Sequence, residues 1–125
     1  LVRTLCRECN QPYHPDRSEY DQLVREYGPA EFEKHLNIFY SEDLQLFAPK
    51  GCQACNNTGY RGRMGIHELL LASDEIKQLI QNRAMMSQIR DQAVGEGMAT
   101  LKQDGISKVF AGHCDLLEVR KVCIR

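Results

Sequence analysis

The chain has 125 residues, 42% of them hydrophobic, which is enough for one domain or two small lobes with a modest core. Its 16 basic and 17 acidic side chains nearly cancel and are interspersed, so composition does not favour nucleic acid or an acidic membrane surface as a partner. No apolar run approaches the roughly 20 residues that cross a bilayer, and the first residues lack the regions of a secretion signal. These observations predict a cytoplasmic protein.

The N-terminal segment carries the first of two C-x-x-C pairs, Cys6 and Cys9. No initiator methionine precedes it, and a cysteine of metal-ligand type already stands at position 6. We therefore expect the chain to be a fragment of a longer protein. Pro12 and Pro15 then predict a loop.

Two short helices are expected next. The segment 16–19, Asp-Arg-Ser-Glu, has the D-x-x-E form of a helix start and predicts a helix that reaches about Tyr27. Gly28 ends this helix, and Pro29 suits the first turn of a second one that ends near Leu36. Residues 44–47 alternate polar and apolar side chains, which predicts a short strand before the second C-x-x-C pair.

The second pair, Cys52 and Cys55, opens a tight loop that ends at Gly59. Beyond Gly62 and Gly65, residues 66–71 form an apolar run that suits either a strand or a buried helical turn. We interpret this run as a strand.

The rest of the chain has helical patterning. A capping serine precedes an amphipathic segment, a capping box opens a later one, and an aspartate opens the last. The expected helices cover residues 74–83, 86–96, 100–111 and 115 onward. The sequence thus predicts a mainly α, α+β fold, with a tetracysteine lobe and helical insert over 1–72 and a helical bundle over 73–125, the two packed together.

The four cysteines of the two pairs are the strongest functional signal. Each pair places two thiolates on one turn, and two pairs supply the ligands of a tetrahedral Zn(II) site, one ion per chain, at Cys6, Cys9, Cys52 and Cys55. Four thiolates leave no position for water or substrate, so this metal would be structural. The same ligands suit iron, and unmetallated or redox-active thiols are the remaining alternatives.

The other metal-ligand types have simpler interpretations. His14 follows Cys9 closely enough to replace a ligand, but a complete cysteine set makes it unnecessary. We expect packing or solvated roles for His35, His67 and His113. Cys114 and Cys123 stand near the two ends of the last helix, too far apart for an easy disulfide.

Motifs for catalysis are missing from the sequence. It contains no P-loop, no dinucleotide-binding glycine motif, no H-E-x-x-H and no G-x-S-x-G. We therefore expect no catalytic residues and no cofactor-binding residues in this fragment.

The residues around both cysteine pairs closely resemble a known family. Residues 5–9 (LCREC), 52–70 (CQACNNTGYRGRMGIHELL) and 97–105 (GMATLKQDG), and then Leu117-Glu118-Val119, are similar to the C-terminal part of the secretion and pilus assembly ATPases. That resemblance implies a parent ATPase with a RecA-like core, which binds ATP and Mg and works as a hexamer in type II secretion or type IV pilus assembly. It also implies zinc at the four cysteines, contacts with neighbouring subunits, and an inner-membrane platform protein as partner, so that the membrane is reached only indirectly.

The sequence suggests a contact role for two arginines, and it leaves two other protein classes to be considered. Arg61 and Arg63 lie on a glycine-rich turn, from which they would reach phosphates or carboxylates of a neighbouring subunit, or simply brace the loop or face solvent. A stand-alone zinc module of chaperone type is the alternative, because residues 52–59 resemble one C-x-x-C-x-G-x-G repeat of the DnaJ family; Asn57 breaks that repeat. A nucleic-acid-binding zinc ribbon would need a basic face, which the balanced charge opposes.

Overall fold

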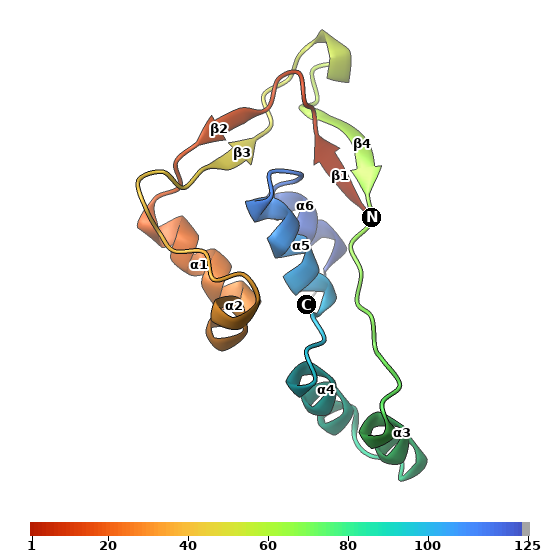
Figure 1. Cartoon of the computed structure of the whole chain (residues 1–125). Coiled ribbons are helices and arrows are strands. Elements are labelled where there is room, and N and C mark those ends of the chain that lie inside the picture. The colour runs from red at the N-terminus through yellow and green to blue at the C-terminus, as the bar shows by residue number, and fades with distance from the viewer. Residues whose placement is uncertain (124–125) are drawn as a thin grey trace.

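A computed structural model describes residues 1–123 (Figure 1). This part of the chain contains four short strands, six helices and one 3-10 turn, η1, and its last four elements are all helices. The strands are β1 (Val2–Leu5), β2 (Gln11–Tyr13), β3 (Leu46–Ala48) and β4 (Tyr60–Met64), and η1 is Gln53–Cys55. The helices are α1 (Arg17–Tyr27), α2 (Pro29–His35), α3 (Asp74–Gln81), α4 (Met86–Gly95), α5 (Leu101–Phe110) and α6 (Leu116–Val122). The expected mainly helical α+β class is confirmed.

The helices start where the capping residues predict. The Asp16 carboxylate accepts a hydrogen bond from the Glu19 N–H at 2.8 Å, and the Ser73 hydroxyl accepts one from the Ile76 N–H at 3.2 Å. Thr100 opens α5 with the reciprocal bonds of a capping box. These side chains satisfy N–H groups that have no partner inside a helix, and so fix each start to within a residue. All six helices agree with the sequence prediction, apart from one or two residues at some ends.

The strands form two separate antiparallel pairs, β1 with β4 and β2 with β3. The sequence predicted β3 but placed it two residues early, because Leu44 belongs to a turn in which its N–H bonds to the Ser41 carbonyl. It missed β1 and β4, and the loop expected around Pro12 is wrong, since Pro12 lies inside β2.

The core lies where α1, α2, α5 and α6 meet the strands. Its aromatic part packs Tyr20, Tyr27, Phe32 and Phe110 at ring-centroid distances of 5.5 to 6.5 Å, close to edge-on in three of four pairs. Val2, Leu23, Leu46, Ile66, Ile106, Val109, Cys114 and Val119 complete it. The first-half and second-half elements are in contact, with α5 and α6 against α1, β1 and β3. The division into lobes 1–72 and 73–125 stays a prediction.

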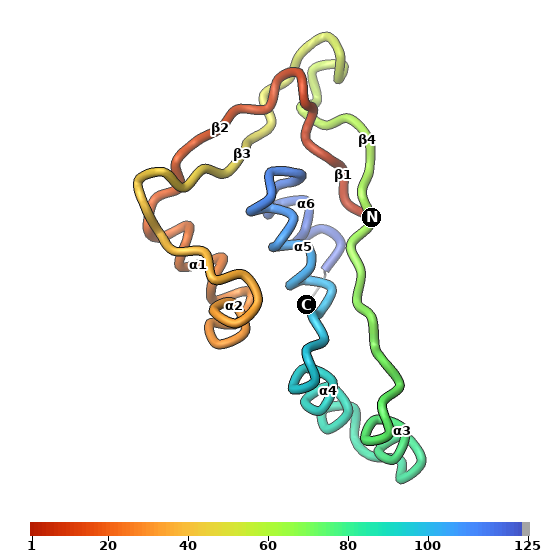
Figure 2. Tube along the Cα trace, in the orientation of Figure 1, coloured from red at the N-terminus to blue at the C-terminus, as the bar shows by residue number. Residues whose placement is uncertain are grey.

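The segment between β4 and α3 differs from expectation. Residues 66–71 were predicted as a strand, but they form no strand pairing within residues 1–123; the chain runs here as a long extended connection to the α3–α4 hairpin (Figure 2). The hairpin helices pack on each other, away from the core (Figure 1). No helix of the described part is long and apolar enough to span a membrane.

Candidate metal centre

The four predicted cysteines come together at one end of the molecule. Cys6 and Cys9 follow β1, Cys52 immediately precedes η1 and Cys55 is the last residue of η1, and all four sulfur atoms lie within 4.8 Å of one another. The closest Sγ–Sγ distances are 3.8 Å for Cys6 to Cys52, 3.8 Å for Cys9 to Cys55 and 3.7 Å for Cys52 to Cys55. A tetrahedral ion with metal–sulfur bonds near 2.3 Å requires sulfurs about 3.8 Å apart. The cluster therefore has the size of a four-thiolate metal site.

The two strand pairs bring the cysteine pairs together. The pairing of β1 with β4 is extended by a 2.9 Å hydrogen bond from the Cys6 N–H to the Gly59 carbonyl. The pairing of β2 with β3 closes the base of the intervening insert, so that residue 51 returns beside residue 9. These neighbouring ladders bring the four thiols together.

Backbone N–H groups point at two of the sulfurs. The Gly51 N–H donates to Cys9 Sγ at 3.3 Å, and the N–H groups of Cys52 and Gly59 both donate to Cys55 Sγ at 3.2 Å. A side chain on Gly51 would meet the Asn57 carbonyl at 2.9 Å, and its φ of +112° also favours glycine. Sequence reasoning missed these donors; Gly51, immediately before the second pair, and Gly59, four residues after it, were their only signal.

The hydrogen bonds and burial shift the pKa values of two neighbouring thiols, Cys55 and Cys52, in opposite directions. Burial acts to raise the pKa of Cys55, but the N–H donors of Cys52 and Gly59 outweigh it and lower this pKa to about 6. Burial, together with the adjoining thiols, raises the pKa of Cys52 to about 11. Of these two thiols, Cys55 therefore ionises at the lower pH, and the ionised thiolate is the form that a metal ion binds.

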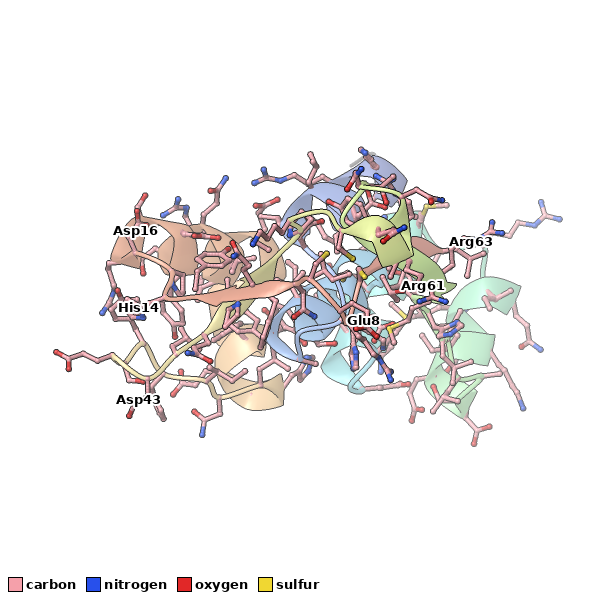
Figure 3. All side chains as sticks on the ribbon, turned by 90° about the horizontal axis from the view of Figure 1, so that it is seen from above. Glu8, His14, Asp16, Asp43, Arg61 and Arg63 are labelled. Atoms are coloured by element: carbon pink, nitrogen blue, oxygen red, sulfur yellow. The ribbon has the colours of Figure 1, made fainter. Side chains whose placement is uncertain are left out.

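The other candidate ligands lie elsewhere. His14 occupies both ring nitrogens away from the cluster, with Nδ1 3.0 Å from the Leu44 carbonyl and Nε2 2.9 Å from the Tyr40 hydroxyl. Figure 3 places it far from Glu8, the residue between the first two cysteines. His35 contacts the Tyr27 hydroxyl at 2.8 Å, in a packing role. Cys114 and Cys123 are free thiols, and Cys114 is fully buried.

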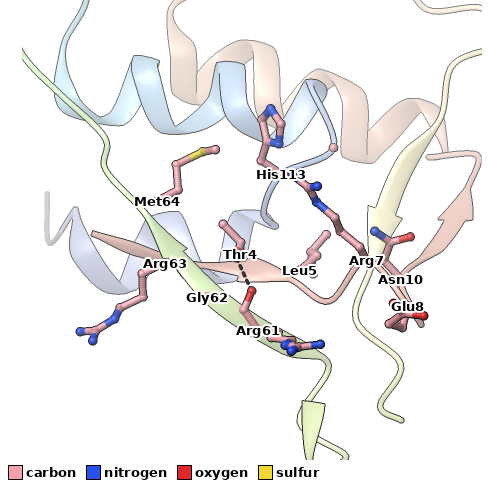
Figure 4. Close-up of a pocket in the computed structure, with 11 residues that line it drawn as sticks. Thr4, Leu5, Arg7, Glu8, Asn10, Arg61, Gly62, Arg63, Met64 and His113 are labelled. Atoms are coloured by element: carbon pink, nitrogen blue, oxygen red, sulfur yellow. Dashed lines mark hydrogen bonds between the residues drawn. The ribbon is translucent and has the colours of Figure 1, made fainter. Parts of the chain in front are cut away.

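Arg61 and Arg63 lie on β4 with exposed side chains, beside a groove of about 470 Å³ (Figure 4). Arg7, Asn10 and His113 also line it, so three arginines surround this hollow, with Glu8 as the opposing charge. The turn expected here is instead a strand with an irregular register opposite Thr4, whose hydroxyl donates to the Arg61 carbonyl at 2.5 Å. This hydrogen bond holds the backbone, and within residues 1–123 both guanidinium groups remain free to bind.

Comparison with known proteins gives a consistent family assignment. The family model described as "Type II/IV secretion system protein" matches residues 1–121. The "Type II secretion system ATPase E" of Vibrio cholerae is 36% identical over 122 residues, which cover 98% of this chain and 22% of that protein. The "Type II secretion system protein E" of Dickeya dadantii is 38% identical over 122 residues, covering 98% of the chain and 21% of that protein.

A pilus protein is similar to the same degree. The "Type IV pilus assembly ATPase PilB" of Thermus thermophilus is 35% identical over 119 residues, which cover 95% of this chain and 12% of that protein. The chain thus spans about a fifth or less of the length of these three curated relatives. The family match spans the segments that carry both cysteine pairs and the groove, and the chain belongs to the type II/IV secretion system protein family.

Proposed function

We propose that this chain is the zinc-binding, noncatalytic C-terminal region of a hexameric ATPase that powers type II protein secretion or type IV pilus assembly. The observation that carries the proposal is the cluster of four sulfurs with near-tetrahedral spacing, in a chain whose relatives are named as such ATPases. Cys6, Cys9, Cys52 and Cys55 would hold one Zn(II) as thiolates.

The metal would act on the fold rather than on a substrate. With four thiolate ligands it has no open position, and its bonds would join the loop after β1 to the loop around η1. Because these loops are distant in the chain, the metal would stabilise the junction of the β1–β4 and β2–β3 pairs. ATP and Mg would bind in another part of the parent protein.

The coupling role concerns neighbours of the chain in the assembled ATPase. We propose that Arg61 and Arg63 contact a carboxylate or phosphate of an adjacent subunit, since both are exposed on one rigid strand beside a groove rich in arginine. Through these contacts the region would pass motion to an inner-membrane platform protein, so that the protein stays cytoplasmic and peripheral to the membrane. Nucleic acid is no partner in this proposal.

The first experiment is metal analysis by plasma mass spectrometry of protein purified without added metal. The proposal expects about one zinc per chain and a lower melting temperature after strong chelation. One iron per chain with a visible absorption band, or a well-folded protein without metal, would contradict the zinc assignment. The coupling role is tested separately: deletion of this region from the parent should abolish secretion or pilus assembly, and normal hexamers and normal transport after deletion would refute it.

The alternative is a stand-alone zinc module, of chaperone or nucleic-acid-binding type. The length of the gene product distinguishes the two proposals. The ATPase proposal expects these residues to lie inside a much longer polypeptide, as they do in the relatives. A free chain of this size that prevents aggregation of an unfolded client, or shifts labelled RNA or DNA at low salt, would favour the alternative.

A further inference from the structure

We propose that an acidic loop of one subunit binds the arginine groove of the next subunit. The loop, named here the acidic tip, is residues 39–43 between α2 and β3, and the arginine groove is the hollow lined by Arg7, Arg61 and Arg63. The inference rests on the proposed function, because it takes the chain to be part of a hexamer. It names the carboxylates that the arginines of β4 contact.

The nearly neutral chain is divided into two regions of opposite charge. The insert between the cysteine pairs, residues 10–50, carries eight acidic and four basic side chains, whereas the rest of the chain carries nine acidic and twelve basic ones. Surfaces of opposite sign attract each other, so two copies are complementary when the insert of one faces the remainder of the other. A second copy of the chain is therefore a suitable partner for either region.

The acidic tip presents two adjacent carboxylates that are free to bind. Glu42 and Asp43 are exposed, and within residues 1–123 neither of them forms an ion pair. The sequence has one other pair of adjacent acidic residues, Asp74 and Glu75. That pair occupies the first turn of α3, where the helix dipole already stabilises negative charge. The carboxylates of the acidic tip have no such stabilisation within their own chain.

Hydrogen bonds hold the acidic tip in one conformation. The Tyr20 hydroxyl of α1 donates to the Ile38 carbonyl at 2.5 Å. The Tyr40 hydroxyl donates to the Pro15 carbonyl at 3.0 Å. The loop is thus tied to the start of α1 and to the helix itself before any partner binds. Because it is already ordered, binding costs little conformational entropy.

An exposed aromatic ring belongs to the same loop. Phe39 is 73% exposed, although Ile38 and Tyr40 on either side of it pack against the core. Guanidinium groups bind aromatic faces as well as carboxylates, and the Arg17 guanidinium, 5.3 Å from the ring centre of Tyr40, makes such a contact within this chain. The acidic tip therefore combines the two kinds of group that an arginine-rich surface binds.

The arginine groove supplies the complementary charges (Figure 4). Arg7, Arg61 and Arg63 are exposed, and within the described part of the chain none of them forms an ion pair. Glu8 is the one carboxylate of the groove lining, so the groove keeps an excess of positive charge. Residues two apart on a strand share a face, so the two arginines of β4 match two adjacent carboxylates with charge-assisted bonds.

The acidic tip and the arginine groove lie on opposite sides of the chain. Figure 3 shows Asp43 on the same side as His14 and Asp16, with Arg61 and Arg63 on the other side. One chain cannot bring its own tip to its own groove, so the contact joins two copies head to tail. A head-to-tail contact uses different surfaces on the two copies and can close into a ring, as the proposed hexamer requires.

Charge reversal in the full-length protein tests the inference. The tip-reversed variant carries Glu42→Lys and Asp43→Lys, and the groove-reversed variant carries Arg61→Glu and Arg63→Glu. Each variant should raise the protein concentration needed for hexamers by about tenfold or more, because like charges then face each other. All four changes are at exposed residues, so the zinc content should stay the same and the melting temperature should change by less than about 4 °C.

A mixture of the two variants gives the sharpest readout. In a ring of alternating subunits, each reversed tip faces a reversed groove and each native tip faces a native groove. Sedimentation of the mixture should therefore show hexamers within about threefold of the concentration that the unmodified protein needs. Glu33→Lys with Asp91→Lys is the matched control, since it makes the same change of net charge at exposed carboxylates outside both surfaces. The control variant should assemble like the unmodified protein.

The outcomes separate the inference from the proposed function. A tip-reversed variant that assembles normally, or a mixture as dissociated as its two components, would overturn the inference. If only the groove-reversed variant dissociates, the arginines contact another carboxylate or a phosphate, and the proposed subunit contact stands without the acidic tip. If both variants assemble normally, that contact is refuted as well. Normal behaviour of the variants in a protein without zinc would refute only the metal assignment.

Discussion

Arg3 and Glu118 are 115 residues apart in the chain and are joined by three hydrogen bonds. The Arg3 N–H donates to Oε1 at 3.1 Å, Nε donates to Oε1 at 3.0 Å, and a terminal guanidinium nitrogen donates to Oε2 at 2.9 Å. The guanidinium also lies 4.1 Å from the ring centre of Tyr60 on β4. One side chain of β1 therefore ties α6 to the strand pair that carries the metal centre.

Glu118 should make folding sensitive to acid. The Arg3 hydrogen bonds, aided by Lys121, lower the pKa of its carboxyl from 4.5 to about 2. Because the folded-state pKa is below the unfolded one, the stabilisation is complete above pH 4.5 and is lost as the pH falls towards 2. Glu118→Gln should lower the free energy of unfolding by about 2 kcal/mol at pH 7 and flatten its pH dependence in that window.

Urea unfolding at a series of pH values measures both effects. Glu75→Gln is the control, because Glu75 is an exposed carboxylate in the first turn of α3. If the two variants lose equal stability and keep the same pH profile, the Arg3 hydrogen bonds do not stabilise the ionised carboxyl.

Loss of one cluster thiol should remove the metal. Cys6 is fully buried, and its sulfur is 3.8 Å from that of Cys52, so Cys6→Ser leaves three soft ligands around a site sized for four. We expect bound zinc to fall from about one per chain to near zero. The melting temperature of the variant should be close to that of the unmodified protein after its zinc has been removed by a chelator. Cys123→Ser is the matched control outside the cluster and should keep its zinc; equal zinc in both variants would disprove the ligand assignment.

The close contact of α5 with α6 depends on a glycine. A Cβ on Gly105 would lie 2.7 Å from Val119 Cγ1, and Val119 is fully buried. Gly105→Ala should therefore destabilise the fold by about 1 to 3 kcal/mol, although alanine favours helix. Gly95→Ala is the control at an uncrowded position, because nothing lies within 4 Å of a Cβ added there. This variant should leave the stability unchanged or raise it by up to about 1 kcal/mol. Thermal unfolding that ranks the two variants in the opposite order would refute this packing argument.

The elements that the sequence predicted well depend on local chemistry. Caps such as Asp16, Ser73 and Thr100 act within one turn, so the helices could be placed from the sequence, and the C-x-x-C spacing alone selected the cysteines that cluster. The strands β1 and β4 depend on pairing between residues 55 to 62 positions apart, and nothing local to either strand predicts that pairing. The pattern at 66–71 favours a strand, but a strand needs a partner, which residues 1–123 do not supply.

The arginine pair on β4 should affect assembly without affecting the fold. The side chains of Arg61 and Arg63 are exposed. The Thr4 hydroxyl donates its hydrogen bond to the backbone carbonyl of Arg61, and any residue at that position supplies the same carbonyl. In the full-length protein, which we propose to be a hexameric ATPase, changing both arginines to glutamine should weaken hexamer formation and ATP turnover by about tenfold, because charge-assisted bonds to a neighbour would be lost. Unfolding free energy should change by less than about 0.5 kcal/mol.

Arg25→Gln serves as the control for that pair, because Arg25 is an exposed arginine on α1 outside the groove. Sedimentation measures the hexamer fraction, phosphate release measures turnover, and salt sensitivity adds an independent readout, since screening weakens exposed ion pairs. The double variant should lose the salt dependence that the parent and Arg25→Gln share. If all three proteins form hexamers equally and respond equally to salt, the arginines merely brace the strand or face solvent.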